Sequence, residues 1–273
     1  MIINGLSSCM DNPTLPPLNY RVDGEGEPVI LIHGVGANLQ SWDTVQAALS
    51  RSRRYKAVRM DLRGHGGSSP IRERYSLERF CADVLEIMDR EAIERAHVVG
   101  FSLGGMIAQC LALNWPERVE RLAFLATVAG RTEQERHKVV SRQELLRDGG
   151  IVAVTEAARE RWFTEQFARQ HPERIEARIR EMVANDLESY IEAYRVFGES
   201  ELAGRLHEIR HPTLVLTGEH DVGSNTRMAR FMHKTIPDSR LVILPELKHS
   251  LLVEAPHIVA DHLLAFLVDE DCS

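Results

Sequence analysis

A serine between two glycines is the residue of this sequence best suited to covalent chemistry. Residues 100–104 read Gly-Phe-Ser-Leu-Gly, so Ser102 has a glycine two positions away on either side. An apolar run at residues 96–101 precedes the serine, and a pattern of small and apolar residues continues to Leu113, which predicts a strand, a sharp turn and a helix. Such a turn holds the hydroxyl out of the sheet, in front of a helix N-terminus, as a nucleophile that attacks carbonyl carbons requires.

A serine hydroxyl needs a base to take its proton at neutral pH, and histidine is the side chain suited to this. Among 12 histidines, His249 comes just after the last predicted strand, residues 240–244, which places it at the same edge of the sheet as Ser102. His33 and His65 belong to turns and are predicted to orient loops by hydrogen bonding. The sequence therefore predicts His249 as the catalytic base.

The imidazole in turn needs a carboxylate that fixes its tautomer and stabilises its charged form. Asp221 follows the predicted strand at residues 212–218, and Glu219 is a competing acid in the same loop. With Asp221 as the acid, the three groups come in the order Ser102, Asp221, His249, each beyond the end of a different strand.

Negative charge that develops on a carbonyl oxygen needs two backbone N–H donors. Leu103 follows the nucleophile directly and opens a helix, so its amide is the first predicted donor of the oxyanion hole. Val35 is the second, because it lies in the loop at residues 33–36, where glycines permit a close backbone approach. Gly34 of the same loop is predicted to contact the substrate.

The elements that position these residues alternate between strand-like and helical patterns, joined by short glycine-rich turns. The pattern predicts an α/β fold with a mostly parallel sheet, helices on both faces, and ligands bound beyond the carboxyl ends of the strands. The predicted strands are residues 18–22, 28–32, 55–60, 96–101, 119–126, 212–218 and 240–244. The main predicted helices are residues 41–50, 75–88, 103–114, 225–235 and 256–268.

Between about residues 131 and 205 the strand-like runs disappear and amphipathic helical patterns follow one another. We predict a helical cap at residues 131–205, inserted in a core of residues 18–130 and 206–269. Residues 1–17 are predicted to form a loosely ordered N-terminal segment. The cap is compatible with a lid over the site and with a plain structural subdomain.

A substrate with a carboxylate would need a cation near the pocket. Arg131, at the junction of core and cap, is the first candidate and Arg161 the second, with a solvated or ion-paired arginine as the alternative for each. Trp42 and Trp162 are predicted to line the pocket, and core packing is the alternative for Trp42.

Composition excludes several classes of protein. The chain has 273 residues, of which 44% are hydrophobic and 27% charged, as is ordinary for one globular domain. A net charge of -7 argues against nucleic acid as a partner. Neither a signal peptide nor an apolar run near the ~20 residues of a membrane span is visible, so we expect a cytoplasmic protein with no membrane partner. The four cysteines are too widely spaced for a metal site or a redox pair, and we expect no metal and no cofactor.

Taken together, the motifs resemble the α/β-hydrolase superfamily over essentially the whole chain. They are the His-Gly pair at residues 33–34, DLRGHGGS at 61–68, GFSLGG at 100–105, Gly218 with Asp221, and His249. Within this superfamily, three segments resemble the 3-oxoadipate enol-lactonases. These are RWFT at 161–164 with HPE at 171–173, SLGGM at 102–106, and AGR at 129–131.

The resemblance implies a serine hydrolase that cleaves a small carboxylic ester or enol-lactone through an acyl-enzyme, in the catabolism of aromatic compounds, with a homodimer as one assembly. Ser102 excludes the haloalkane dehalogenase and epoxide hydrolase branches, whose nucleophile is an aspartate. A proline typical of perhydrolase-type relatives is missing from the loop at residues 35–39. Carbon–carbon bond hydrolases of ring-cleavage products, general carboxylesterases and other lactonases stay open, as does a ligand receptor on the same scaffold.

Overall fold

The computed structural model describes residues 17–268. Most of the predicted N-terminal segment, residues 1–16, and the last residue of the predicted core, Asp269, lie outside the described residues. Within residues 17–268, no helix is both long and apolar enough to cross a bilayer.

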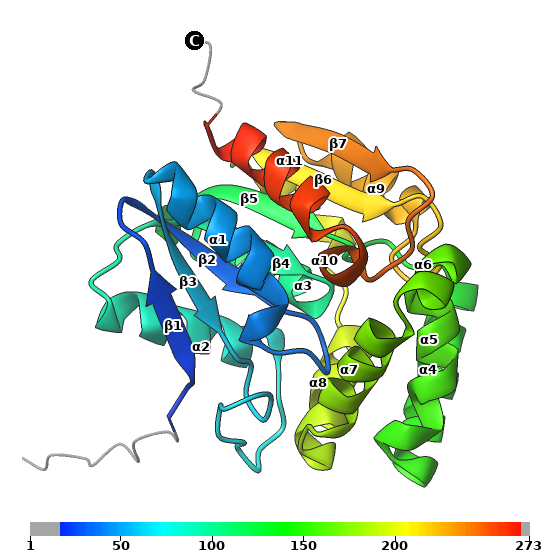
Figure 1. The fold of residues 1–273 in the computed structure, drawn as a ribbon. Helices are drawn as coiled ribbons and strands as arrows, with labels where there is room; N and C mark the ends of the chain where they lie inside the picture. The colour runs from blue at the N-terminus through cyan, green and yellow to red at the C-terminus, as the bar shows by residue number, and fades with distance from the viewer. Residues whose placement is uncertain (1–16, 269–273) are drawn as a thin grey trace, which may run out of the picture.

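A sheet of seven strands forms the centre of the molecule, in the order β1-β3-β2-β4-β5-β6-β7 (Figure 1). Strand β1 pairs antiparallel with β3, whereas every other neighbouring pair is parallel, so the predicted mostly parallel sheet is confirmed. The strands are β1 (Tyr20–Asp23), β2 (Glu27–Ile32), β3 (Tyr55–Met60), β4 (Ala96–Phe101), β5 (Val119–Leu125), β6 (Thr213–Gly218) and β7 (Ser239–Leu244).

Helices cover both faces of this sheet, as predicted (Figure 1). On one face lie α1 (Asp43–Ser52) and α11 (Pro256–Val268). The other face is covered by α2 (Leu77–Arg90), α3 (Leu103–Asn114) and α9 (Thr226–Thr235).

The central strands are apolar on both sides, which is why they stand out in the sequence. In β4, Val98 packs into the cluster that contains α2 and α3, whereas Val99 packs into the cluster that contains α1 and α11. Ile30 and Leu31 of β2 divide in the same way. A strand buried on both faces shows no alternation of apolar and polar residues, so it reads as a continuous apolar run.

Helix α2 anchors the loop that follows β3. The helix begins after Ser76, whose hydroxyl accepts a hydrogen bond from the amide of Arg79. Arg63, in the loop after β3, donates from its guanidinium to the carboxylate of Asp83 on α2 at 3.1 to 3.2 Å. Both side chains are fully buried, so the loop is fixed to the helix by an ion pair that water does not reach.

A group of helices lies between β5 and β6, at the edge toward which the parallel strands point (Figure 1). We call this group the cap. It contains an apolar cluster of its own, in which Phe163, Ile179 and Met182 are buried. The helices are α4 (Glu133–Gly149), η3 (Ile151–Val154), α5 (Thr155–Trp162), α6 (Glu165–Gln170), α7 (Pro172–Val183), α8 (Leu187–Glu199) and η4 (Ala203–Glu208). The boundaries between core and cap at residues 131 and 205 stay a prediction.

Three short helices complete the described chain and were not predicted as separate elements. They are η1 (Leu39–Trp42), which runs directly into α1, η2 (Pro116–Arg118), and α10 (Leu251–Glu254), which follows the loop of His249.

The ion pair between Arg63 and Asp83 predicts a large effect of one substitution. Asp83→Asn should lower the free energy of unfolding by about 3–5 kcal/mol, because it removes the fully buried negative charge that pairs with the fully buried guanidinium of Arg63. Asp89→Asn on the same helix is the matched control, since Asp89 is 67% exposed where it pairs with Arg118, and such pairs contribute about 0–1 kcal/mol. Urea unfolding of both variants measures the difference, and equal losses would contradict the assignment.

Candidate active site

Ser102 occupies the sharp turn between β4 and α3 that the sequence predicts. Its φ is +54°, a backbone conformation that residues other than glycine rarely adopt and that costs about 1–3 kcal/mol. The turn is closed so tightly that a Cβ on Gly100 would stand 2.1 Å from the carbonyl oxygen of Gly104. The Ser102 amide donates to the carbonyl of Leu125 at 2.9 Å, and the hydroxyl of Thr127 donates to the Ser102 carbonyl at 2.6 Å. Both backbone polar groups of Ser102 are thus bound, one by the last residue of β5 and the other by the segment just after β5.

His249 and Asp221 form a hydrogen-bonded pair. The distance between His249 Nδ1 and Asp221 Oδ2 is 2.7 Å, and the carboxylate is almost fully buried. Burial alone would raise the pKa of Asp221, but the adjacent imidazole and the amides of Ser224 and Gly223 outweigh burial and hold this pKa below its usual value. A charged carboxylate at Nδ1 keeps the proton there and leaves Nε2 free to accept one.

Glu219, the competing acid, does not reach the imidazole. Its side chain is exposed, and its carboxylate accepts a hydrogen bond from the amide of Glu246 at 3.1 Å. Asp221 is therefore the acid that the structure pairs with His249.

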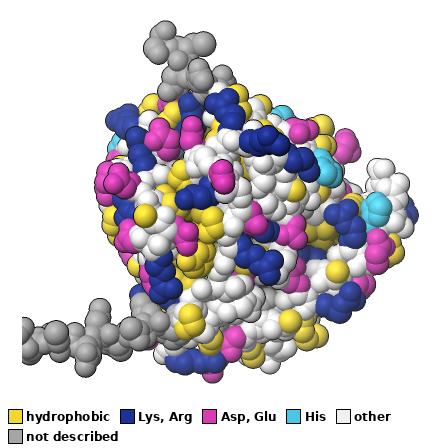
Figure 2. All heavy atoms as spheres, turned by 60° about the vertical axis from the view of Figure 1, so that its left-hand side comes forward, with side chains coloured by type: hydrophobic (Ala, Val, Ile, Leu, Met, Phe, Trp, Pro, Cys, Tyr) yellow, Lys and Arg dark blue, Asp and Glu magenta, His cyan; other side chains and the backbone are white. Residues whose placement is uncertain are grey.

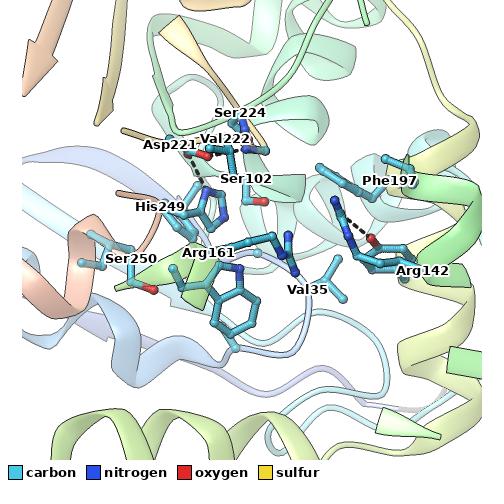
Figure 3. Close-up of a pocket in the computed structure, with 18 of the residues that line it drawn as sticks. Val35, Ser102, Arg142, Arg161, Phe197, Asp221, Val222, Ser224, His249 and Ser250 are labelled. Atoms are coloured by element: carbon cyan, nitrogen blue, oxygen red, sulfur yellow. Dashed lines mark hydrogen bonds and ion pairs between the residues drawn. The ribbon is translucent and has the colours of Figure 1, made fainter. Parts of the chain in front are cut away.

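Ser102, Asp221 and His249 line one pocket, at the carboxyl ends of β4, β6 and β7 (Figure 3). The imidazole is flanked by two aromatic rings, with ring centroids 5.0 Å away for Phe101 and 6.3 Å away for Trp162. Trp162 thus lies in the pocket wall, where the sequence predicts it.

The loop after β2 brings Gly34 and Val35 into the same pocket. A Cβ on Gly34 would stand 2.9 Å from the Cβ of Ser102, so only glycine lets this loop come so close to Ser102. Leu103 opens α3, and an amide in the first turn of a helix has no carbonyl partner within that helix. Val35 thus belongs to the loop that contacts Ser102, and Leu103 directly follows Ser102, while the role of their amides as oxyanion donors stays a prediction.

His33 and His65 orient loops, as predicted. His33 joins the loop after β2 to the loop after β3, because its Nδ1 donates to the Gly34 carbonyl at 2.7 Å and its Nε2 accepts from the Leu62 amide at 3.0 Å. His65 Nδ1 lies 3.0 Å from the carbonyl of Arg63. Burial lowers the pKa of His33 to about 3 and that of His65 to about 4, so both rings are neutral at physiological pH.

The prediction that Trp42 lines the pocket is wrong. Its side chain is fully buried in the cluster that contains α1 and α11, where it packs with residues such as Val45 and Leu251. The ring points into the core because Trp42 is the last residue of η1 and the N-cap of α1, and that face of the turn is covered by the sheet and α10. Core packing, the alternative, is correct.

The two candidate arginines have different surroundings. Arg131 borders the pocket, but its guanidinium donates to the carbonyls of Phe197 (2.7 Å) and Ser200 (3.3 Å) and lies over the Phe197 ring. Arg161 points into the pocket near Val35 (Figure 3), and its Nε donates to a carbonyl of its own helix, that of Ala157, at 3.0 Å. Burial, together with the charge of Arg142, lowers the pKa of Arg161. Among the described residues, no carboxylate forms an ion pair with it.

Several lining residues were not found from the sequence. Arg142 on α4 donates to the hydroxyl of Tyr194 on α8 at 3.1 Å, and Arg178 on α7 lies with its guanidinium over the ring of Trp162. Nothing in the sequence separates these two arginines from the many others of the cap. Tyr190 and Tyr194 carry a signal, since their spacing of four places them on one helix face, but an apolar helix face does not by itself indicate a pocket.

Comparison with known proteins agrees with this arrangement. The family described as the alpha/beta hydrolase fold matches residues 27–256. The chain therefore belongs to the α/β-hydrolase family and is a hydrolytic enzyme, which confirms the resemblance found in the sequence.

Two relatives and one solved structure are similar to this chain over most of its length. The chain is 30% identical over 241 residues to 3-oxoadipate enol-lactonase 2 of Acinetobacter baylyi, with 88% of each chain covered. It is 28% identical over 252 residues to (E)-2-((N-methylformamido)methylene)succinate hydrolase of the same organism, covering 91% of this chain and 93% of the relative. The solved structure of the enol-lactonase from Burkholderia xenovorans LB400 matches with a TM-score of 0.86 and 29% identity, over 92% of this chain and 96% of that chain.

The two buried histidines make stability depend on pH. Their pKa values in the folded protein lie below the ordinary value of 6.5. Between about pH 6.5 and those lowered values, the unfolded chain binds protons that the folded chain does not bind, so the free energy of unfolding falls as the pH falls.

We expect His33→Gln to flatten this dependence between about pH 6 and 4.5, by about 1.4 kcal/mol per pH unit. A glutamine offers one donor and one acceptor to the same backbone partners but does not titrate. His257→Gln is the control, because His257 is exposed. Urea unfolding at stepped pH measures the slope, and an unchanged slope in His33→Gln would show that this ring is not held neutral.

Proposed function

We propose that this hydrolase opens a carboxylate-bearing ester or enol-lactone with Ser102 as nucleophile, His249 as base and Asp221 as the orienting acid. The observation that carries this proposal is the convergence of a serine on a strained turn and a His–Asp pair in one pocket. Three groups with these roles, presented from three strands, are the arrangement that acyl transfer needs.

In the proposed reaction, the Ser102 hydroxyl attacks the substrate carbonyl carbon while His249 Nε2 takes its proton. The amides of Val35 and Leu103 hold the oxyanion that forms. The tetrahedral intermediate then collapses, its C–O bond breaks, and His249 returns the proton to the enol or alkoxide that leaves. Water, activated by His249, hydrolyses the resulting acyl-enzyme and regenerates Ser102. With a lactone, leaving group and acyl chain are one molecule, so a single product departs.

A carboxylate on the substrate is supported by the charges around the pocket. Five basic side chains line it: Arg131, Lys138, Arg142, Arg161 and Arg178. Of the two acids in the wall, Asp221 pairs with His249, and Glu135 accepts from Asn225 at 2.7 Å and from Arg227 at 2.6 Å. The pocket is thus cationic in a chain whose net charge is -7. The outer surface differs, since acidic and basic side chains are interspersed on the face in Figure 2.

Arg161 is the anchor that we propose for this carboxylate. A partly buried guanidinium with no carboxylate partner has lost hydration without a compensating ion pair, and a substrate carboxylate would supply that pair. Arg131 is less suited because its donors are already bound to carbonyls of the chain. The names of two relatives, a 3-oxoadipate enol-lactonase and a succinate-derivative hydrolase, support acidic substrates in the same way.

Ser102→Ala should lower the turnover of p-nitrophenyl acetate by about 10³-fold or more, because the variant retains only the oxyanion donors and substrate binding. The purified variant should also lose labelling by a fluorophosphonate, which reacts with an activated serine. Substantial residual turnover or labelling would remove Ser102 from the proposed role. A wild-type protein that neither turns over esters nor reacts would favour a ligand receptor.

Arg161→Met should raise KM about tenfold or more for the mono-p-nitrophenyl ester of adipic acid, and leave KM for p-nitrophenyl acetate unchanged. Arg131→Met is the matched control, and its effect should be the same on the charged and the neutral ester. Equal effects of Arg161→Met on both esters would contradict the anchor. Enol-lactones and ring-cleavage dienoates in the same panel decide between lactone opening and carbon–carbon bond cleavage.

A further inference from the structure

The tip of the loop that carries Val35 is held by the cap. The carbonyl oxygen of Gly36 accepts a hydrogen bond from Arg178 Nη1 on α7 at 2.7 Å. It accepts a second, longer one from Asn185 Nδ2, just beyond the end of α7, at 3.2 Å. One carbonyl of a core loop is therefore bound by two side chains that lie about 145 residues further along the chain.

The loop is a β-turn whose shape depends on Gly36. The amide of Ala37 donates to the Gly34 carbonyl at 3.2 Å, which closes the turn around Val35 and Gly36. The φ of Gly36 is +72°, and Val35 has no positive φ, as in a type II turn. The Gly36 carbonyl and the Val35 amide lie in the same four-residue turn. A donor that fixes the direction of the carbonyl therefore also restrains the direction of the amide.

The fit between this turn and the cap is close. A Cβ on Gly36 would stand 2.6 Å from a ring carbon of Tyr190 on α8 and 3.0 Å from Met182 on α7. Below the turn, His33 binds the Gly34 carbonyl from the core side. The turn is therefore held between a core histidine at its base and cap residues at its tip.

Arg178 itself is oriented by several contacts. Its guanidinium carbon lies 5.0 Å from the ring centroid of Trp162, the aromatic residue beside His249, and Nη1 is 3.7 Å from the carboxylate of Glu181. Its side chain is 10% exposed. Because the donor that reaches Gly36 is fixed from two other sides, Arg178 is suited to hold a backbone group, whereas Arg161 has donors left for a substrate.

We propose that Arg178 is a positioning residue that holds the Gly34–Ala37 turn in the conformation where the Val35 amide faces the oxyanion. This inference rests on the proposed function, since it gives the oxyanion hole a support supplied by the cap. Asn185 supports the same carbonyl as the weaker donor. It follows that the oxyanion hole is complete only when α7 is docked on the loop.

The test compares Arg178→Met, Arg178→Lys and Asn185→Ala with Arg174→Met. Arg174 is the matched control because it lies one turn earlier on α7, over the ring of Phe167 at 5.2 Å, and donates to the carbonyl of Val253 instead of the loop. Each variant is assayed with p-nitrophenyl acetate and with the mono-p-nitrophenyl ester of adipic acid. The Kd of phenylboronic acid, which forms a tetrahedral adduct with serine, reports on the oxyanion site, and near-ultraviolet circular dichroism reports on folding.

A positioning role predicts that Arg178→Met lowers kcat about 30- to 100-fold on both esters, with KM within about twofold and the boronate Kd raised by a similar factor. Arg178→Lys should recover part of kcat, Asn185→Ala should lose about threefold, and Arg174→Met should stay within about twofold. If Arg178→Met does not fold, Arg178→Lys and Asn185→Ala carry the test.

Three results would overturn the inference. An unchanged kcat in Arg178→Met would show that the turn holds without it. A KM effect confined to the charged ester would make Arg178 a substrate anchor. Equal losses in Arg174→Met would assign the effect to the cap as a whole. A wild-type protein without turnover or boronate binding would overturn the proposed function as well, which separates that failure from the other three.

Discussion

The close approach of three backbone segments around Ser102 is the constraint on which the rest of the structure depends. The strand β4, the start of α3 and the loop after β2 come so near one another that no side chain fits between them. A Cβ on Gly104 would stand 2.1 Å from the carbonyl of Ile32, and one on Gly34 would touch Ser102 itself. Because hydrogen is the only side chain that allows these contacts, glycines at these positions let the loop after β2 and the start of α3 approach Ser102 closely.

Around this centre, core and cap contribute different chemistry. The core presents the hydroxyl, imidazole and carboxylate at the ends of parallel strands, and the carboxylate of Asp221 is bound by His249 and by the amides of Gly223 and Ser224. Most of the basic side chains of the pocket come from the cap, where Arg142 and Arg161 lie on different helices. The core and the cap contact each other next to His249, where the amide of Ser250 donates to the carbonyl of Trp162 at 3.0 Å. They also meet at the tip of the loop after β2, where Arg178 donates to the carbonyl of Gly36.

The sequence predicted what local pattern and chain order determine. Strands buried on both faces appear as apolar runs, and β3 and β4 begin and end at the predicted residues. The pairing of His249 with Asp221 follows from the rule that parallel strands end at one edge. The direction of Trp42 could not be predicted, because a short turn of helix gives no periodicity. The different surroundings of Arg131 and Arg161 could not be predicted either, because they depend on which backbone carbonyls the fold brings next to each guanidinium.

The separate apolar cluster of the cap has a consequence for how such an enzyme changes over evolutionary time. Because the cap packs much of its apolar surface within itself, pocket-facing side chains on α4 and α5 can be exchanged without repacking the sheet. New specificities can therefore arise in those two helices while the chemistry of the core is inherited unchanged. Helix α7 is not free in this way. Its inner face packs against the turn that carries Val35, so substitutions there would disturb the position of a loop that contacts Ser102.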